Sequence, residues 1–128
     1  MKNLFLLFIT AALFVSNNGF AQSGNITLPA ASKNNPSFQS IARGMQDSEL
    51  EQKLLKIINN LSAEKNWKMT YTDCKILSSS WSPSGLEACL FGKGPSGQCS
   101  YQVFNFEKGK DGNPMMKKSG QQYRTTCP

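Results

Sequence analysis

The stretch Cys74–Cys127, CKILSSSWSPSGLEACLFGKGPSGQCSYQVFNFEKGKDGNPMMKKSGQQYRTTC, holds all four cysteines of the chain. Three segments rich in Gly, Pro, Asn, Asp and Ser interrupt it, and these residue types supply the backbone angles that chain reversals need. The segments between them are rich in aromatic, β-branched and Thr residues, which is typical of strands. We therefore expect a four-stranded antiparallel meander, with strands at Lys68–Leu77, Leu86–Phe91, Gln98–Glu107 and Gln121–Cys127.

The spacing of the cysteines predicts two disulfides. Folding each hairpin about the middle of its turn places Cys74 opposite Cys89 and Cys99 opposite Cys127, with all four cysteines on one face of the sheet. Close and wide pairs alternate across an antiparallel sheet, so if Cys74 and Cys89 form a close pair, Cys99 and Cys127 do as well. We expect the bridges 74–89 and 99–127, while the other two connectivities stay open. The chain has no histidine and no Cys-x-x-Cys spacing, so we expect no metal site.

Residues 1–21 have the features of a secretory signal peptide. Lys2 precedes the apolar run Leu4–Val15, and the small residues Gly19 and Ala21 mark a cleavage site before Gln22. The apolar run is too short for a membrane span, so we expect none after cleavage. The expected location is therefore outside the cytoplasm, in a periplasm or secreted, where disulfides persist.

The rest of the chain divides into a flexible arm, residues 22–46, and a disulfide-stapled domain, residues 47–128. The arm shows no sustained helical or strand period. We expect a helix over Ser48–Lys65, opened by a capping box of Ser48 and Glu51. Its single apolar stripe predicts that it packs on the sheet. The stripe consists of Leu50, Leu54, Ile57, Ile58 and Leu61.

The fold class that follows is α+β, with one N-terminal amphipathic helix packed on the sheet. Trp67, Met69 and Tyr71 alternate with polar residues, as in a half-buried strand. The phase of this alternation switches before Cys74, which predicts a β-bulge near Thr72.

The composition argues against the common catalytic machineries. Without histidine there is no Ser-His-Asp or Cys-His triad and no histidine acid–base pair. The remaining acid–base candidates are carboxylates: Asp73, Glu87, Glu107 and Asp111. In the expected register Glu87 lies opposite Tyr101 with no second carboxylate beside it, so the pair that glycoside hydrolysis needs is missing. We therefore expect a protein that is not an enzyme and that uses no cofactor.

Two features are typical of a binding surface. The expected loop Glu107–Gly120 contains lysines and methionines that could form an adaptable cationic patch, unless both methionines tuck under the loop. The second feature is Trp81 at the tip of the first hairpin, which could anchor an interface or fold back on the sheet. The candidate binding residues are Trp81, Lys108, Lys110, Met115, Met116, Lys117 and Lys118.

The function that these features favour is a small exported, non-enzymatic binding protein, inhibitor-like or immunity-like, that contacts another macromolecule through its hairpin loops. Its net charge of +6 favours an acidic partner, which we expect to be another exported or envelope protein. One alternative is an envelope or secretion-assembly component that docks through residues 22–46. Another is a small secreted enzyme or toxin that depends on carboxylates. The export signal makes nucleic acid the least favoured partner.

Overall fold

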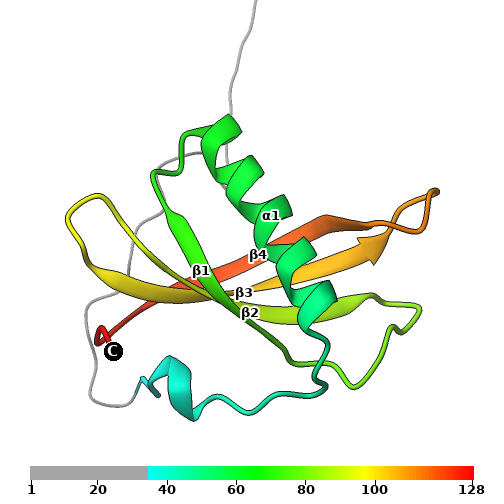
Figure 1. Cartoon of the computed structure of the whole chain (residues 1–128), viewed down its shortest axis with the longest axis horizontal. Helices are drawn as coiled ribbons and strands as arrows, with labels where there is room; N and C mark the ends of the chain where they lie inside the picture. Colours follow the sequence, from blue (N-terminus) through cyan, green and yellow to red (C-terminus); the bar gives the residue numbers. More distant parts are fainter. Residues whose placement is uncertain (1–34) are drawn as a thin grey trace, which may run out of the picture.

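The computed structural model describes residues 35–128. Figure 1 shows one helix, α1, lying across one face of a sheet whose four antiparallel strands pair in the order β1-β2-β3-β4. The α+β prediction is confirmed, but the helix is not N-terminal, because residues 35–47 precede it. The elements are the 3-10 turn η2 (Phe38–Ser40), α1 (Ser48–Lys65), β1 (Thr70–Ile76), β2 (Leu86–Lys93), β3 (Cys99–Lys108) and β4 (Pro114–Thr125).

Helix α1 has the predicted bounds but a different N-cap. Asp47, not Ser48, occupies that position, and its carboxylate accepts a hydrogen bond from the Leu50 N–H at 3.1 Å. The expected capping box is therefore wrong. Glu51 does not reach back to the cap because its carboxylate forms an ion pair with Arg43. Within residues 35–128, no helix has the length and apolar character to cross a membrane.

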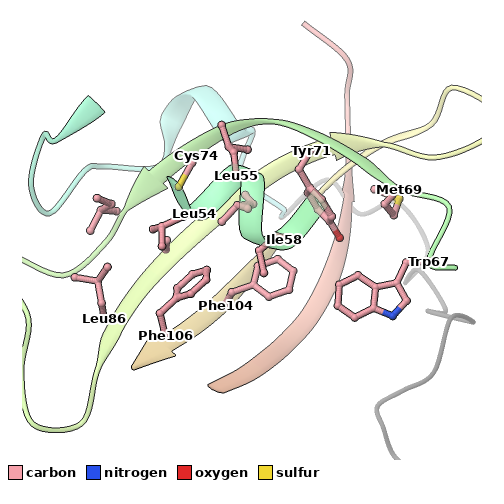
Figure 2. Close-up of a cluster of buried hydrophobic side chains, with 13 residues drawn as sticks. Leu54, Leu55, Ile58, Trp67, Met69, Tyr71, Cys74, Leu86, Phe104 and Phe106 are labelled. Carbon is pink, nitrogen blue, oxygen red and sulfur yellow. The ribbon is translucent and has the colours of Figure 1, made fainter. Parts of the chain in front are cut away.

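The main core lies between α1 and the sheet. Leu54 and Ile58 of the helix are fully buried there, as are Phe104 and Phe106 of β3. Figure 2 shows Leu86, Phe106, Phe104 and Trp67 following one another along this layer. Burial of large apolar side chains of this kind is the main stabilising term of a small domain.

The register of β1 overturns the prediction that all cysteines share one face. The bulge lies between Tyr71 and Asp73, as expected. However, Cys74 is opposite Leu90, and Cys89 is opposite Lys75. Because a shift of one residue turns a side chain to the other face, Cys74 packs under α1 while Cys89 lies on the outer face. The predicted 74–89 disulfide is therefore wrong, and both thiols are free.

The outer face of the sheet is partly covered by residues 36–41, which we name the strap. Phe38 packs on Phe91 with ring centroids 5.3 Å apart, and the Tyr101 hydroxyl donates a hydrogen bond to the carbonyl of Pro36 at 2.8 Å. The Lys75 ammonium donates to three strap carbonyls. The strap belongs to the segment that we expected to be an arm. The predicted signal peptide and residues 22–34 lie outside the described residues.

Candidate functional site

The lysine-rich segment is a β-hairpin, not the loop that we expected between residues 107 and 120. Strand β3 continues to Lys108 and β4 begins at Pro114, so only residues 109–113 form the turn. The Gly109 N–H donates to the Asn113 carbonyl at 2.7 Å, which closes the turn. Figure 1 shows this hairpin, in orange, extending from one end of the sheet. Met115, Met116, Lys117 and Lys118 thus lie on a strand whose register fixes their directions.

The two methionines of the hairpin point in opposite directions. Met116 is opposite Phe106 and packs against the core under α1, where it is half-buried. Met115 is opposite Glu107 on the outer face and is 52% exposed. Among residues 35–128 it is the one large hydrophobic side chain that is exposed. The sequence left open whether the methionines form an exposed patch or tuck inward. Met115 is exposed, and Met116 packs inward.

Trp81 folds back on the sheet and does not project from the first hairpin. Its side chain is half-buried and packs against the core cluster under α1. The Lys108 ammonium lies 5.5 Å from the centre of the Trp81 ring, which is a cation–π distance. The structure thus brings together two predicted binding residues from neighbouring hairpins, and it leaves Trp81 with part of its surface exposed.

The four lysines of the hairpin are all solvent-exposed. With Glu107 and Asp111 they leave residues 107–118 a net charge of +2. Lys117 is the extra residue of a bulge, because Met116 is opposite Phe106 while Lys118 is opposite Asn105. Lysines and bulges on an edge strand disfavour pairing with another strand, which gives Lys117 and Lys118 of β4 a structural use. The exposed lysines are Lys108, Lys110, Lys117 and Lys118.

The predicted carboxylates do not gather around a cleft. Glu87 is opposite Asn105, not Tyr101, so the expected register was wrong here. Glu107 lies on β3, two residues beyond Asn105 and on the same face of the sheet as Glu87. Both carboxylates are exposed. A glycosidase places its two carboxyl groups on either side of the bond that it cleaves. The exposed outer face provides no such enclosure for Glu87 and Glu107.

An open pocket of about 450 Å³ lies at the C-terminal end of α1 and contains none of the predicted site residues. Asn66 and Lys68, which both have positive φ angles, line it together with Thr70 and Pro95. Within residues 35–128, no group of three or more potential metal-ligating side chains comes together.

The cysteines stabilise the fold and lack the features of nucleophiles. Cys99 and Cys127 form the predicted disulfide, which ties the C-terminus to the start of β3. Burial raises the pKa of both the Cys74 and Cys89 thiols to about 12, so both stay protonated near neutral pH. A reactive cysteine needs a lowered pKa and solvent access, and these two thiols have neither.

The hairpin surface, consisting of Trp81, Lys108, Lys110, Met115, Lys117 and Lys118, is the strongest candidate among the predicted residues. Of the methionines, only Met115 belongs to it, because Met116 packs inward. The exposure of Met115 and the faces of the strand residues could not be read from the sequence, because both depend on where β4 begins. No family model, curated protein or solved structure matches this chain.

Proposed function

We propose that this is an exported, non-enzymatic binding protein that contacts an acidic surface of another exported or envelope protein through the hairpin surface. The observation that carries the proposal is Met115, which is 52% exposed on a hairpin with four solvent-exposed lysines. An unbranched, polarizable side chain adapts to a partner's shape, and the ammonium groups of the same hairpin favour carboxylates on that partner.

The hairpin is held in a defined orientation, and this supports its use as a contact surface. Trp81 and Met116 both pack against the core cluster under α1, and Lys108 lies over the Trp81 ring. A surface that is already ordered loses less conformational entropy on binding than a flexible loop does.

The location is part of the same proposal. Residues 1–21 have the pattern of a signal peptide, and the Cys99–Cys127 disulfide is consistent with an oxidising compartment. A periplasmic or secreted partner would then meet the hairpin surface directly.

The test is affinity capture from the native exported fraction with two variants of equal charge. In the first, the four hairpin lysines become glutamine; in the second, four exposed lysines elsewhere do. The hairpin set is Lys108, Lys110, Lys117 and Lys118, and the matched set is Lys53, Lys56, Lys65 and Lys93. We expect one stoichiometric acidic partner that binds the wild type and the matched variant, and that is lost with the hairpin variant.

Met115→Ala separates the apolar contribution from the charge. Burying the exposed half of a methionine contributes about 1 kcal/mol, so affinity for the captured partner should fall about fivefold. Binding should also weaken as salt rises, because charges at the rim of an interface are screened. If both lysine variants lost the partner equally, the overall charge of the protein would explain the binding. That result would contradict the proposal.

A further inference from the structure

Three buried polar atoms lack a hydrogen-bond partner within residues 35–128. They are Trp67 Nε1, Ser100 Oγ and Gln122 Nε2. Buried polar atoms in native proteins are nearly always paired with protein atoms or an ordered molecule, so a group of unpaired ones calls for an explanation. Ser100 and Gln122 are almost completely buried, with exposures of 0% and 2%.

Ser100 and Gln122 lie on the same face of the sheet, under α1. Gln102 is opposite Gln122, and both its amide oxygen and its amide nitrogen have a partner: the oxygen accepts from the Tyr71 hydroxyl at 3.2 Å, and the nitrogen donates to the Gly120 carbonyl at 2.6 Å. Ser100 lies two residues before Gln102 on β3, so its hydroxyl points to the same side. Gln122, although opposite a satisfied glutamine, has no acceptor for its own amide hydrogens.

Trp67 belongs to the same layer. Its indole stacks on Phe104 with ring centroids 6.4 Å apart, and Tyr71 meets Phe104 edge-on at 5.8 Å. Figure 2 shows the Tyr71 hydroxyl pointing between Phe104 and Trp67. The Trp67 indole therefore lies beside the polar end of the core, which we name the polar layer: Trp67, Tyr71, Ser100, Gln102 and Gln122.

A basic side chain lies at the rim of the polar layer. Arg124 is opposite Ser100 in the register of β3 and β4, so the two side chains share a face. Arg124 is exposed, and within residues 35–128 its guanidinium forms no ion pair. Directly opposite residues on one sheet face have Cβ atoms only about 5 Å apart.

The unpaired groups of the polar layer share one chemical preference. An indole N–H and a guanidinium only donate hydrogen bonds, an amide nitrogen offers two donors, and a hydroxyl can donate as well. Buried donors without an acceptor are best satisfied by a group with several acceptor oxygens, and a charged oxygen forms the stronger bond. The positive charge of Arg124 offsets part of the cost of bringing an anion to a buried site.

We propose that the polar layer binds an oxyanion, the carboxylate or phosphate group of a small ligand, between Arg124 at the rim and the inner donors Ser100, Gln122 and Trp67. The hairpin surface belongs to the other end of the sheet, because β3 begins next to Ser100 and ends at Lys108. The two sites are therefore independent, and the failure of one proposal would not affect the other.

The chain's two tryptophans provide a direct measurement. In ¹⁵N-labelled protein each indole N–H gives its own NMR signal, so Trp67 reports on the polar layer and Trp81 serves as an internal control. The protein is titrated with phosphate, with acetate and with chloride at matched ionic strength. We expect a saturable downfield shift of the Trp67 signal with phosphate or acetate, no saturable shift with chloride, and an unmoved Trp81 signal. Phosphate and acetate then distinguish the two kinds of oxyanion.

Two variants test the residues. Arg124→Gln changes an exposed side chain and should weaken oxyanion binding about tenfold, because it removes a charge-assisted contact. Ser100→Ala should weaken it as well. Lys93→Gln is the matched control, since Lys93 lies at the same end of the sheet but on the outer face, opposite Cys99. It should leave binding unchanged.

Three results would overturn the proposal. The first is a Trp67 shift that does not saturate or that chloride reproduces. The second is unchanged binding in Arg124→Gln. The third is a magnetisation transfer from water to the Trp67 indole N–H with no response to either oxyanion, which would assign the polar layer to internal water alone.

Discussion

Replacing Lys75 by methionine should loosen the strap from the outer face of the sheet. The Lys75 ammonium donates hydrogen bonds to the carbonyls of Phe38 at 2.6 Å, Gln39 at 3.2 Å and Ile41 at 2.8 Å. It also lies 4.6 Å from the centre of the Phe38 ring. Methionine keeps an unbranched apolar stem of similar length, so Lys75→Met removes the charge and the donors while most of the packing remains.

The expected loss is about 3 kcal/mol of unfolding free energy. A hydrogen bond that involves a charged group contributes about 1.5–3 kcal/mol. The bonds to Phe38 and Ile41 are partly buried and count at the lower end of this range, whereas the bond to Gln39 is exposed and adds little. The unfolding free energy of a small domain is only about 5–15 kcal/mol in total, so a loss of this size is large.

Urea unfolding of the wild type and Lys75→Met measures this loss, and limited proteolysis within residues 36–41 shows whether the strap is its source. Lys56→Met is the control, because Lys56 is an exposed helix residue. It should change stability by less than about 0.5 kcal/mol. A loss below about 1 kcal/mol in Lys75→Met, or an unchanged proteolysis pattern in the strap, would refute the reasoning.

Three further predictions concern the cysteines. Reducing Cys99–Cys127, which closes a loop of 28 residues, should lower the unfolding free energy by about 3.5 kcal/mol in the chain-entropy model. Urea titrations with and without dithiothreitol measure it, and identical midpoints would contradict it. Cys74 and Cys89 should resist alkylation in the native state and react in urea, so fast native alkylation would be a contrary result. Burial raises the pKa of both thiols from 9.0 to about 12. Their contribution to stability should therefore be complete below pH 9 and fall by about 1.4 kcal/mol per thiol and pH unit as pH rises toward 12. Urea titrations on either side of pH 9 should show this decline, and a smaller one in Cys74→Ala.

The elements with strong local signals were predicted correctly. The bounds of the helix, Ser48–Lys65, agree with the structure because residues that favour a helix start come together at its N-terminus, and an apolar stripe and a polar C-terminal turn lie within the segment. The bulge beside Thr72 also follows from a local pattern, since the alternation of buried residues changes phase there.

Strand β4 was predicted too short for two local reasons. Pro114 and Gly120 are residues that usually interrupt strands. In the structure Pro114 is the first residue of an edge strand, where its missing N–H costs no ladder bond, and Gly120 lies at an irregularity opposite Val103. Whether these two residues end a strand or belong to it depends on the pairing with β3. That pairing cannot be read from the sequence of β4 alone.

The register between β1 and β2 determines on which face of the sheet Cys74 and Cys89 lie. A hairpin folded about the middle of its turn places Cys74 opposite Cys89, but the observed turn places Cys74 opposite Leu90. Gly85, with φ of 117°, closes this turn through hydrogen bonds with Ser82. This shift of a single residue separates the two thiols onto opposite faces and removes the predicted bridge.

The sequence by itself predicted the helix, the four-stranded meander and the α+β class, and it favoured the Cys99–Cys127 disulfide among three connectivities, because each follows from residue types a few positions apart or from adjacent strands in a meander. Only the tertiary structure decided that the strap covers the outer face, that Met115 points out while Met116 points in, and that the polar layer contains unpaired donors. These features join residues far apart in the chain, and they depend on strand register and on which surfaces pack together. No local pattern of side chains encodes that information.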